Sequence, residues 1–340
     1  MPVAIVTGVT GQDGSYLAEF LLDKGYVVHG VIRRTTRKPE DTWAPVGREN
    51  FVVHDADLED QASLLKMLHR VGRPERLEVY NLAAQSHVAV SFSCPLSTSQ
   101  INYVGVLNLL EAIRQMDLLS VTRFYQASTS EMFGEVREIP QKETTPFNPC
   151  SPYGVAKVAA HMAVKNYRDS YDLFGCCGIL FNHESPRRGY NFVTQKIVKE
   201  FQNVFTQGTC MELGNLDAKR DWGHAKDYVQ AMWMMLQQDV PGDYVVATGE
   251  QHSVRDFVEA VVRQYRKEIR WQGEGISEVG IIEGREVIRV NPEFYRPCEV
   301  NTLLGDSSKI RRLGWSPSFS LEELVKDMCG NAPRAITKLY

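Results

Sequence analysis

Residues 3–14 read Val3-Ala-Ile-Val-Thr7 followed by Gly8-Val-Thr-Gly11-Gln-Asp-Gly14. The first five residues are mostly apolar and β-branched, which is typical of a buried strand. Glycines follow at intervals of three, and an apolar pattern with helical spacing then occupies residues 15–24. Glycines at such a strand-to-helix turn allow the backbone to approach a pyrophosphate at the N-terminus of the helix. The stretch therefore predicts a phosphate-binding loop at the start of a parallel sheet.

Short apolar runs alternate with helical patterns through the first half of the chain. Further strands are expected at residues 26–32, 78–82, 123–127 and 176–181, and helices at residues 62–69, 96–116 and 153–171. Strands separated by helices favour the α/β class with a Rossmann-type, doubly wound parallel sheet. Beyond residue 183 the pattern loosens, which indicates a smaller C-terminal α/β lobe with a helix at residues 192–207. A helix at residues 227–238 and a strand at residues 244–248 are expected to return to the sheet.

Composition narrows the class of partner. The 340 residues include 38 Lys and Arg against 42 Asp and Glu, so the net charge is −4. Such a chain has no overall cationic field to hold nucleic acid or a membrane surface. No stretch approaches the roughly 18–20 apolar residues of a membrane span, and no signal peptide precedes the first strand, so a cytoplasmic protein is expected. The seven cysteines are scattered without a Cys-x-x-Cys pair, so neither a disulfide framework nor a metal site is expected.

The tip of the second predicted strand is basic, with Arg33 and Arg34. An NAD-binding chain of this architecture carries Asp or Glu there to hold the ribose hydroxyls. Two guanidinium groups suit a 2′-phosphate, so NADP is favoured as the cofactor. By position alone, Asp57-Leu58 after a third apolar run is a candidate for holding the adenine. Residues 81–86, at the end of the fourth strand, lie where the ribose and phosphates of the cofactor would pass.

A candidate catalytic group lies in the middle of the chain. Tyr153 and Lys157 are four residues apart in a predicted helix, so their side chains face one side of it. An ammonium about 4 Å from a phenol favours the phenolate by about 4 kcal/mol at an effective dielectric of about 20. We therefore expect a lowered pKa for Tyr153 and a general base near neutral pH. Thr129 and Glu131 follow the preceding strand, at the sheet edge where parallel-sheet enzymes hold their chemistry.

Several stretches of the chain, taken together, resemble the extended short-chain dehydrogenase/reductase superfamily and, within it, the GDP-mannose 4,6-dehydratase family. The matching stretches are residues 81–88, 124–131, 179–189, 214–224 and 295–300. The resemblance implies catalytic roles for Thr129, Glu131, Tyr153 and Lys157. Around NADP it implies Gly8, Val9, Thr10, Gly11, Gln12, Asp13, Gly14, Arg33, Arg34, Thr35, Thr36, Asp57, Leu58, Leu82, Ala83, Ala84, Gln85, Ser86, Tyr153, Lys157, His183 and Arg188. Around a GDP-sugar it implies Ser86, Thr129, Ser130, Glu131, Asn182, Val193, Lys196, Leu213, Gly214, Arg220, Arg296 and Glu299.

The resemblance also implies an activity and a division of the chain. The activity is the NADP-dependent dehydration of GDP-mannose to GDP-4-keto-6-deoxymannose, by oxidation at C4, loss of water across C5 and C6, and return of hydride to C6. Such a lyase serves the synthesis of a deoxyhexose such as GDP-fucose or GDP-rhamnose. Residues 1–182, with returning segments near residues 225–250, would form the NADP-binding Rossmann domain. Residues 183–340 would form the GDP-sugar-binding lobe.

Two alternatives stay open. One is a dehydratase that acts on another GDP-sugar, such as a GDP-heptose, or that also reduces its keto product. The other is a catalytically silent NADP-binding protein, against which the complete catalytic quartet argues.

The chain is expected to form a homo-oligomer, either a dimer or a tetramer. The two long helices predicted at residues 96–116 and 153–171 carry apolar stripes on more than one face, and a single sheet can bury only one stripe of each. Residues 35–49 depart from the family, because they look shorter than the loop that helps to build the tetramer in relatives. Ser97, Met162 and Tyr190 also depart from the family's pattern, but none belongs to the catalytic set.

Overall fold

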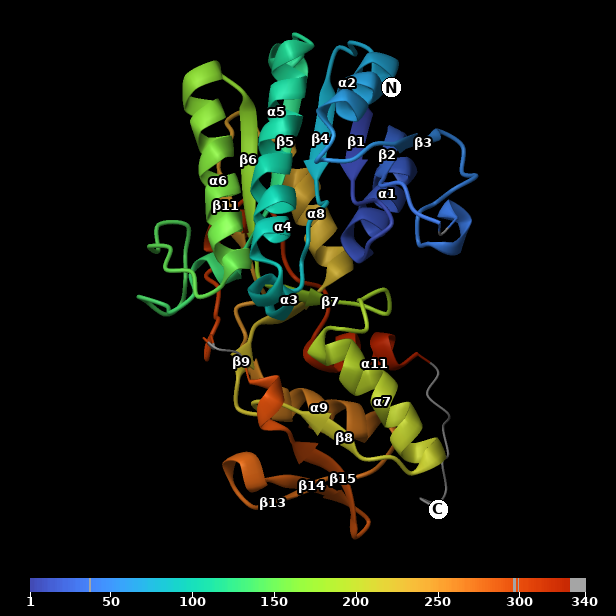
Figure 1. The fold of residues 1–340 in the computed structure, drawn as a ribbon, viewed down its shortest axis with the longest axis vertical. Coiled ribbons are helices and arrows are strands. Elements are labelled where there is room, and N and C mark those ends of the chain that lie inside the picture. The colour runs from blue at the N-terminus through green and yellow to red at the C-terminus, as the bar shows by residue number, and fades with distance from the viewer. Residues whose placement is uncertain (37, 296–297, 299, 331–340) are drawn as a thin grey trace.

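The computed structural model describes residues 1–36, 38–295, 298 and 300–330. Figure 1 shows a large sheet flanked by helices, with a smaller group of helices and strands below it. The large sheet has the strand order β11-β6-β5-β4-β1-β2-β3, and every neighbouring pair in it is parallel. Its strands are β1 (Val3–Thr7), β2 (Val27–Ile32), β3 (Phe51–Asp55), β4 (Leu77–Asn81), β5 (Thr122–Thr129), β6 (Phe174–Leu180) and β11 (Asp243–Val246). The predicted Rossmann-type, doubly wound sheet is confirmed.

Helices cover both faces of this sheet. On one face lie α1 (Gln12–Asp23) and α8 (Ala225–Leu236), and on the other lie α2 (Gln61–Val71), α5 (Gly105–Gln115) and α6 (Pro152–Tyr171). The side chains of β1 alternate between the two cores, with Ala4 and Val6 packed on the first face and Ile5 on the second. Strand order reverses between β1 and β4, and ligands of open α/β sheets bind at such a reversal, beyond the carboxyl ends of the strands.

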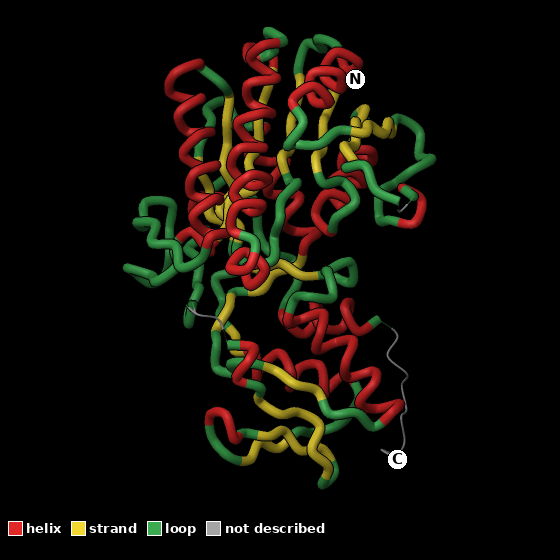
Figure 2. The backbone as a smooth tube through the Cα atoms, in the orientation of Figure 1, coloured by secondary structure: helices red, strands yellow, loops and turns green. Residues whose placement is uncertain are grey.

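The lower part of the molecule has its own apolar core. A sheet of order β13-β14-β15-β8 packs under three helices (Figures 1 and 2). Its elements are α7 (Val193–Gln207), β8 (Met211–Leu213), α9 (Val254–Gln264), β13 (Arg270–Gln272), β14 (Val279–Ile282), β15 (Arg285–Val290) and α11 (Leu321–Cys329). Two small sheets lie between the two parts: β7 (Asn182–Glu184) with β10 (Trp222–His224), and β9 (Lys219–Arg220) with β12 (His252–Ser253).

The remaining elements are short. They are η1 (Pro39–Asp41), α3 (Val88–Ser93), α4 (Pro95–Ser99), η2 (Gln100–Val104), η3 (Leu119–Val121), η4 (Ser130–Met132), η5 (Gly275–Ser277), η6 (Pro292–Phe294) and α10 (Ser308–Arg311). No helix in the described part of the chain has the length and apolarity that crossing a membrane requires.

The helix predicted at residues 96–116 is confirmed, and it contains one π-helical turn. The chain forms α4, then the π-helical turn η2, and only then α5. Asn102 within that turn is buried and exchanges two hydrogen bonds with the backbone of Gln85, each 2.8 Å long. A π-turn shifts the register of a helix locally and is common at functional sites. Here the π-helical turn contains Asn102, whose side chain binds the backbone of the segment that follows β4.

The first helix begins three residues earlier than predicted, at Gln12, because Gly11 is its N-cap residue. The last glycine of the phosphate loop therefore lies inside the helix. A Cβ at Gly14 would lie 2.3 Å from the oxygen of Gly8 and 2.7 Å from the Cα of Val9. A Cβ at Gly11 would lie 3.3 Å from the same oxygen and would require only a small shift.

This difference predicts graded effects on stability. Gly14→Ala should lower the free energy of unfolding by about 1–3 kcal/mol, the usual range for overpacking a tight site. Gly11→Ala, in the same loop, is the matched control and should cost clearly less. Urea unfolding followed by circular dichroism measures both. Equal stability of Gly14→Ala and wild type would contradict the tight packing of this loop.

Candidate active site

The first turn of α6 and the end of β5 meet at the carboxyl edge of the sheet. Ser151 caps α6 by accepting a hydrogen bond from the backbone N–H of Gly154, so Tyr153 enters the site from the first helical turn. Thr129 is the last residue of β5, and its hydroxyl oxygen accepts a 3.2 Å hydrogen bond from the N–H of Glu131. Tyr153 and Glu131 are both buried, and Thr129 hydrogen-bonds to the Tyr153 hydroxyl. The structure thus brings together the hydroxyl, carboxylate and phenol that the sequence singled out.

The predicted lowering of the Tyr153 pKa is wrong for the chain by itself. Burial raises the pKa of Tyr153 to about 12, although the hydrogen bond from Thr129 acts in the opposite direction. The ammonium of Lys157 lies 5.8 Å from the centroid of the Tyr153 ring and donates a 2.9 Å hydrogen bond to the backbone oxygen of Ala127. Sequence spacing placed the two residues on one helix face, but it contained no information on burial, which dominates here.

Lys157 itself is buried. Burial lowers the pKa of Lys157 to about 8, which the charge of Asp13 partly opposes. The bond to Ala127 fixes the side chain against β5.

The phosphate loop adopts a conformation that fits a dinucleotide. The N-cap residue of α1, Gly11, has no side-chain acceptor for the first backbone N–H groups of the helix. Such N–H groups and the helix dipole together favour a phosphate. Gly8 has φ +67°, and a Cβ there would lie 2.9 Å from the N atom of Ala83. The Thr7 hydroxyl accepts hydrogen bonds from the N–H groups of Leu82 and Ala83, each 3.0 Å long, which ties this loop to the segment after β4.

Two side chains of the same loop bind strand β7. Gln12 donates to the backbone oxygen of His183 at 3.1 Å and accepts a 2.8 Å hydrogen bond from the Ser185 hydroxyl. The carboxylate of Asp13 lies 2.8 Å from Nε2 of His183. Burial opposes the ionisation of Asp13, but the contact with His183 outweighs it and lowers the Asp13 pKa. The same contact raises the pKa of His183 against the effect of its own burial.

The other predicted cofactor residues line neighbouring strand ends. Arg33, Arg34, Thr35 and Thr36 are exposed directly after β2. Leu58 is buried and Asp57 half-buried after β3. Leu82, Ala83, Ala84 and Gln85 are half-buried after β4, and Ser86 is exposed. The structure therefore places the predicted cofactor residues along the edge formed by β1, β2, β3 and β4.

The predicted sugar-nucleotide residues fall into two groups. Ser86, Thr129, Ser130, Glu131 and Asn182 lie at or just after the ends of strands. Val193, Lys196, Leu213 and Gly214 belong to the lower part of the molecule. Arg296 and Glu299 lie outside the described residues.

Three basic side chains to which the resemblance assigns ligand contacts have partners within the protein. Arg188 pairs with Glu184 at 3.0 Å and lies over the ring of Phe192. Lys196 donates a 2.7 Å hydrogen bond to the backbone oxygen of Glu212, and burial lowers its pKa. Arg220 is buried in β9 and donates to the backbone oxygen of Lys219 at 2.9 Å.

Sequence reasoning missed Arg187, the neighbour of Arg188. Its guanidinium pairs with Glu19, donates to the hydroxyl of Ser15 and lies 3.9 Å from the centre of the Tyr16 ring, all on α1. The two adjacent arginines thus point to different parts of the molecule. The signal available in the sequence was the doubled arginine after Ser185-Pro186, since neighbouring residues in a turn face different ways.

The solved structures that match this chain share its fold. The UDP-glucose 4-epimerase of Thermus thermophilus, in complex with NAD, matches with a TM-score of 0.79 and 27% sequence identity, over 97% of this chain and 98% of the epimerase. The likeness covers both the sheet and the lower part of the molecule.

Sequence relatives are closer. The family model described as GDP-mannose 4,6 dehydratase matches residues 5–328. The GDP-mannose 4,6 dehydratase of Drosophila melanogaster is 52% identical over 337 residues, which cover 96% of this chain and 85% of the relative. The GDP-mannose 4,6-dehydratase of Vibrio cholerae is 51% identical over 346 residues, covering 96% of this chain and 92% of the relative. These comparisons establish that the chain belongs to the GDP-mannose 4,6-dehydratase family.

Proposed function

We propose that this chain is a hydro-lyase that dehydrates GDP-mannose to GDP-4-keto-6-deoxymannose, with NADP as its cofactor. The observation that carries the proposal is the convergence of Thr129, Glu131 and Tyr153 beside Lys157. Relatives about half identical to this chain are named for the same reaction. The product is a precursor of deoxyhexoses.

The residues at the carboxyl edge of the sheet suit NADP. The uncapped N-terminus of α1 would hold the pyrophosphate, and the exposed Arg33 and Arg34 would hold the 2′-phosphate. Bound NADP supplies a hydride acceptor for C4 of the sugar, a positive ring charge, and the hydride that returns to C6. Residues 1–182, with the returning segments near residues 225–250, would form the domain that binds it, and residues 183–340 the domain that binds the GDP-sugar.

In the first step, Tyr153 takes the proton from the O4 hydroxyl while C4 is oxidised. Its high pKa when buried has to fall for this role. Within the chain, the hydrogen bond from Thr129 and the charge of Arg188 both lower it. Thr129 would also hydrogen-bond O4 and hold it against the phenol. Geometry of this kind is the usual prerequisite for general base catalysis.

In the second step, Glu131 removes the proton from C5. The ketone at C4 makes this hydrogen acidic, because the resulting negative charge is delocalised onto the ketone oxygen. Glu131 then passes a proton to the C6 hydroxyl, which leaves as water. One carboxylate thus serves as both base and acid in the elimination. When hydride returns to C6, C5 takes up one proton, which balances the proton that Tyr153 removed from O4.

The lower part of the molecule supplies cations for the nucleoside diphosphate. Lys196 and Arg220 stand on α7 and β9, respectively. Guanidinium and ammonium groups bind diphosphate oxygens through charge-assisted hydrogen bonds. Lys196 is half-buried, and this burial lowers its pKa.

The proposal predicts product without any added cofactor. The enzyme as purified, incubated with GDP-mannose alone, should produce the alkali-induced absorbance of a 4-keto sugar, because hydride taken from C4 is returned to C6. Tyr153→Phe should produce neither ketone nor transient NADPH. Glu131→Gln should still oxidise C4 and show NADPH absorbance, but should form product about 10²–10⁴-fold more slowly.

Solvent deuterium exchange at C5 is the second measurement. Glu131→Gln should exchange this hydrogen much more slowly than wild type, because an amide lacks a basic oxygen. Product formation by Glu131→Gln at a rate near that of wild type would exclude Glu131 as the base. Turnover of GDP-heptose in place of GDP-mannose would redirect the proposal to another GDP-sugar.

Cofactor choice is tested by the nucleotide that the protein retains. Mass analysis of acid-released nucleotide should identify NADP(H) as the main species, because two exposed guanidinium groups follow β2. Replacing Arg33 and Arg34 by serine should reduce retention of NADP(H) more than that of NAD(H). Arg48, which is also basic but pairs with Asp23, gives the control Arg48→Ser. NAD(H) as the main species in wild type would refute the charge argument.

We also propose that the chain pairs through α6. Val155 and Met162 are 55% and 48% exposed, and their spacing of seven residues places them on one helix face. Leu96 on α4, a helix that contacts α6, is 86% exposed. Light scattering at micromolar concentration should give at least a dimer. Met162→Glu should shift it toward monomer, whereas Val240→Glu at another exposed apolar position should not. A wild-type monomer would refute the pairing.

A further inference from the structure

The face of α6 that carries Tyr153 and Lys157 continues for one more turn. His161 follows Lys157 at the same spacing of four residues, so the three side chains form one row along the helix. All three are buried. The row contacts three successive residues at the end of β5: Tyr153 hydrogen-bonds to Thr129, Lys157 to the backbone oxygen of Ala127, and His161 to Ser128. Three side chains of α6 thus bind three consecutive residues of β5, next to the candidate active site.

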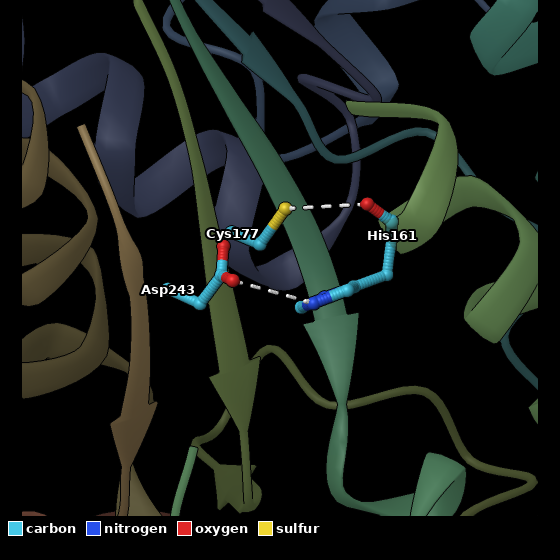
Figure 3. A group of neighbouring side chains, drawn as sticks. All are labelled: His161, Cys177 and Asp243. Carbon is cyan, nitrogen blue, oxygen red and sulfur yellow. Dashed lines mark hydrogen bonds and ion pairs between the residues drawn. The ribbon is translucent and has the colours of Figure 1, made fainter. Parts of the chain in front are cut away.

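The bond between His161 and Ser128 is entirely internal. Nδ1 of His161 lies 3.0 Å from the Ser128 hydroxyl oxygen, and each of the two residues is 3% exposed. On its other side, Nε2 of His161 lies 3.7 Å from a carboxylate oxygen of Asp243 on β11 (Figure 3). The second oxygen of this carboxylate accepts a 2.6 Å hydrogen bond from Arg168, also on α6. The chain of contacts runs from Arg168 through Asp243 and His161 to Ser128.

The charge of Asp243 determines which ring nitrogen of His161 donates and which accepts a hydrogen bond. Burial would raise the pKa of Asp243, but hydrogen bonding from His161 and Arg168 outweighs burial and holds the pKa below its usual range. A carboxylate facing Nε2 favours the imidazole form with its proton on Nε2. Nδ1 is then the acceptor for the Ser128 hydroxyl. The hydroxyl of Ser128 is thus oriented by the imidazole, which in turn faces the Arg168–Asp243 ion pair.

We propose that His161 is a positioning residue of the active site, which acts through Ser128 to fix the end of β5. Ser128 immediately precedes Thr129, and Glu131 follows two residues later. A shift of the strand end would move both groups relative to Tyr153, and displacements of about 1 Å in a catalytic site can cost 10²-fold in rate. The proposal rests on the dehydratase function proposed above, because it concerns the same reaction.

A metal site is the competing interpretation of this cluster. One ligand atom each from His161, Cys177 and Asp243 lie within 4.8 Å of one another. However, the Cys177 sulfur points to the backbone oxygen of His161 and not to its ring (Figure 3). Burial raises the pKa of Cys177 well above its usual value, which keeps the thiol protonated. The guanidinium of Arg168 also occupies the carboxylate that a cation would need. These contacts favour an internal polar chain.

The test uses two variants that break the same bond from opposite ends. Ser128→Ala and His161→Phe should each lower kcat about 10- to 100-fold, with KM for GDP-mannose and retained cofactor within about 3-fold of wild type. The double variant should be no slower than the slower single variant, because both changes remove one interaction. Cys177→Ser is the control from the same cluster and should keep the wild-type kcat.

Conservative substitution separates positioning from packing. His161→Asn places an amide near the position of Nδ1 and should recover most of the kcat that His161→Phe loses. Thermal unfolding of each variant shows whether it is folded at the assay temperature. Ser128→Ala removes only one oxygen, so it keeps the test valid if His161→Phe does not fold.

Each outcome has one meaning. A wild-type kcat in Ser128→Ala, or losses that multiply in the double variant, would overturn the positioning role. One zinc per chain in dialysed wild type, absent from Cys177→Ser, would overturn it in favour of a metal site. Wild type without dehydratase activity would instead refute the proposed function, so the two failures are distinguishable.

Discussion

The contact between the first turn of α1 and strand β7 holds the molecule together at the point where the chemistry is proposed. Gln12 and Asp13 bind His183 and Ser185 from a position about 170 residues earlier in the chain. Nε2 of His183 lies 2.8 Å from the Asp13 carboxylate, and this contact raises the pKa of His183 and lowers that of Asp13. These contacts therefore join the phosphate loop to the segment that leads from the large sheet into the lower part of the molecule.

The two arginines that follow Ser185-Pro186 bind different partners. Arg187 turns back to α1, where Glu19 and the Tyr16 ring hold it. Arg188 turns toward Glu184 and lies over Phe192, at the start of α7. The Arg187 guanidinium thus binds the segment after β7 to α1, while the charge of Arg188 acts on Tyr153. A turn of the backbone, rather than any difference in side-chain chemistry, separates a structural role from a proposed functional one.

Apolar periodicity in the sequence predicted the strands and helices whose formation depends on neighbouring residues in the chain. β1 is apolar and β-branched over Val3–Thr7, and it forms as expected. The helix predicted at residues 96–116 also forms, but its π-helical turn and the hydrogen bonds of Asn102 to the backbone of Gln85 involve a partner that helical spacing does not reveal. The four residues proposed to be catalytic were singled out from residue types, from strand order and from the family resemblance. The pKa of Tyr153 could not be predicted in this way, because it is set by burial, and the partner of Lys157 is a backbone oxygen that any residue at position 127 would provide.

Strand β11 forms the outer edge of the main sheet, beside β6, although more than sixty residues separate the two strands in the chain. Until β11 is in place, the edge of β6 has unpaired N–H and C=O groups and can pair with another chain. Helix α8 also needs later residues, since Trp315 and Ser318 hydrogen-bond to Asp227. During synthesis, the sheet that starts at Val3 therefore stays incomplete until β11, which ends at Val246, has left the ribosome. A truncated chain that ends after β7 would expose the unpaired edge of β6 and would need chaperones to avoid aggregation.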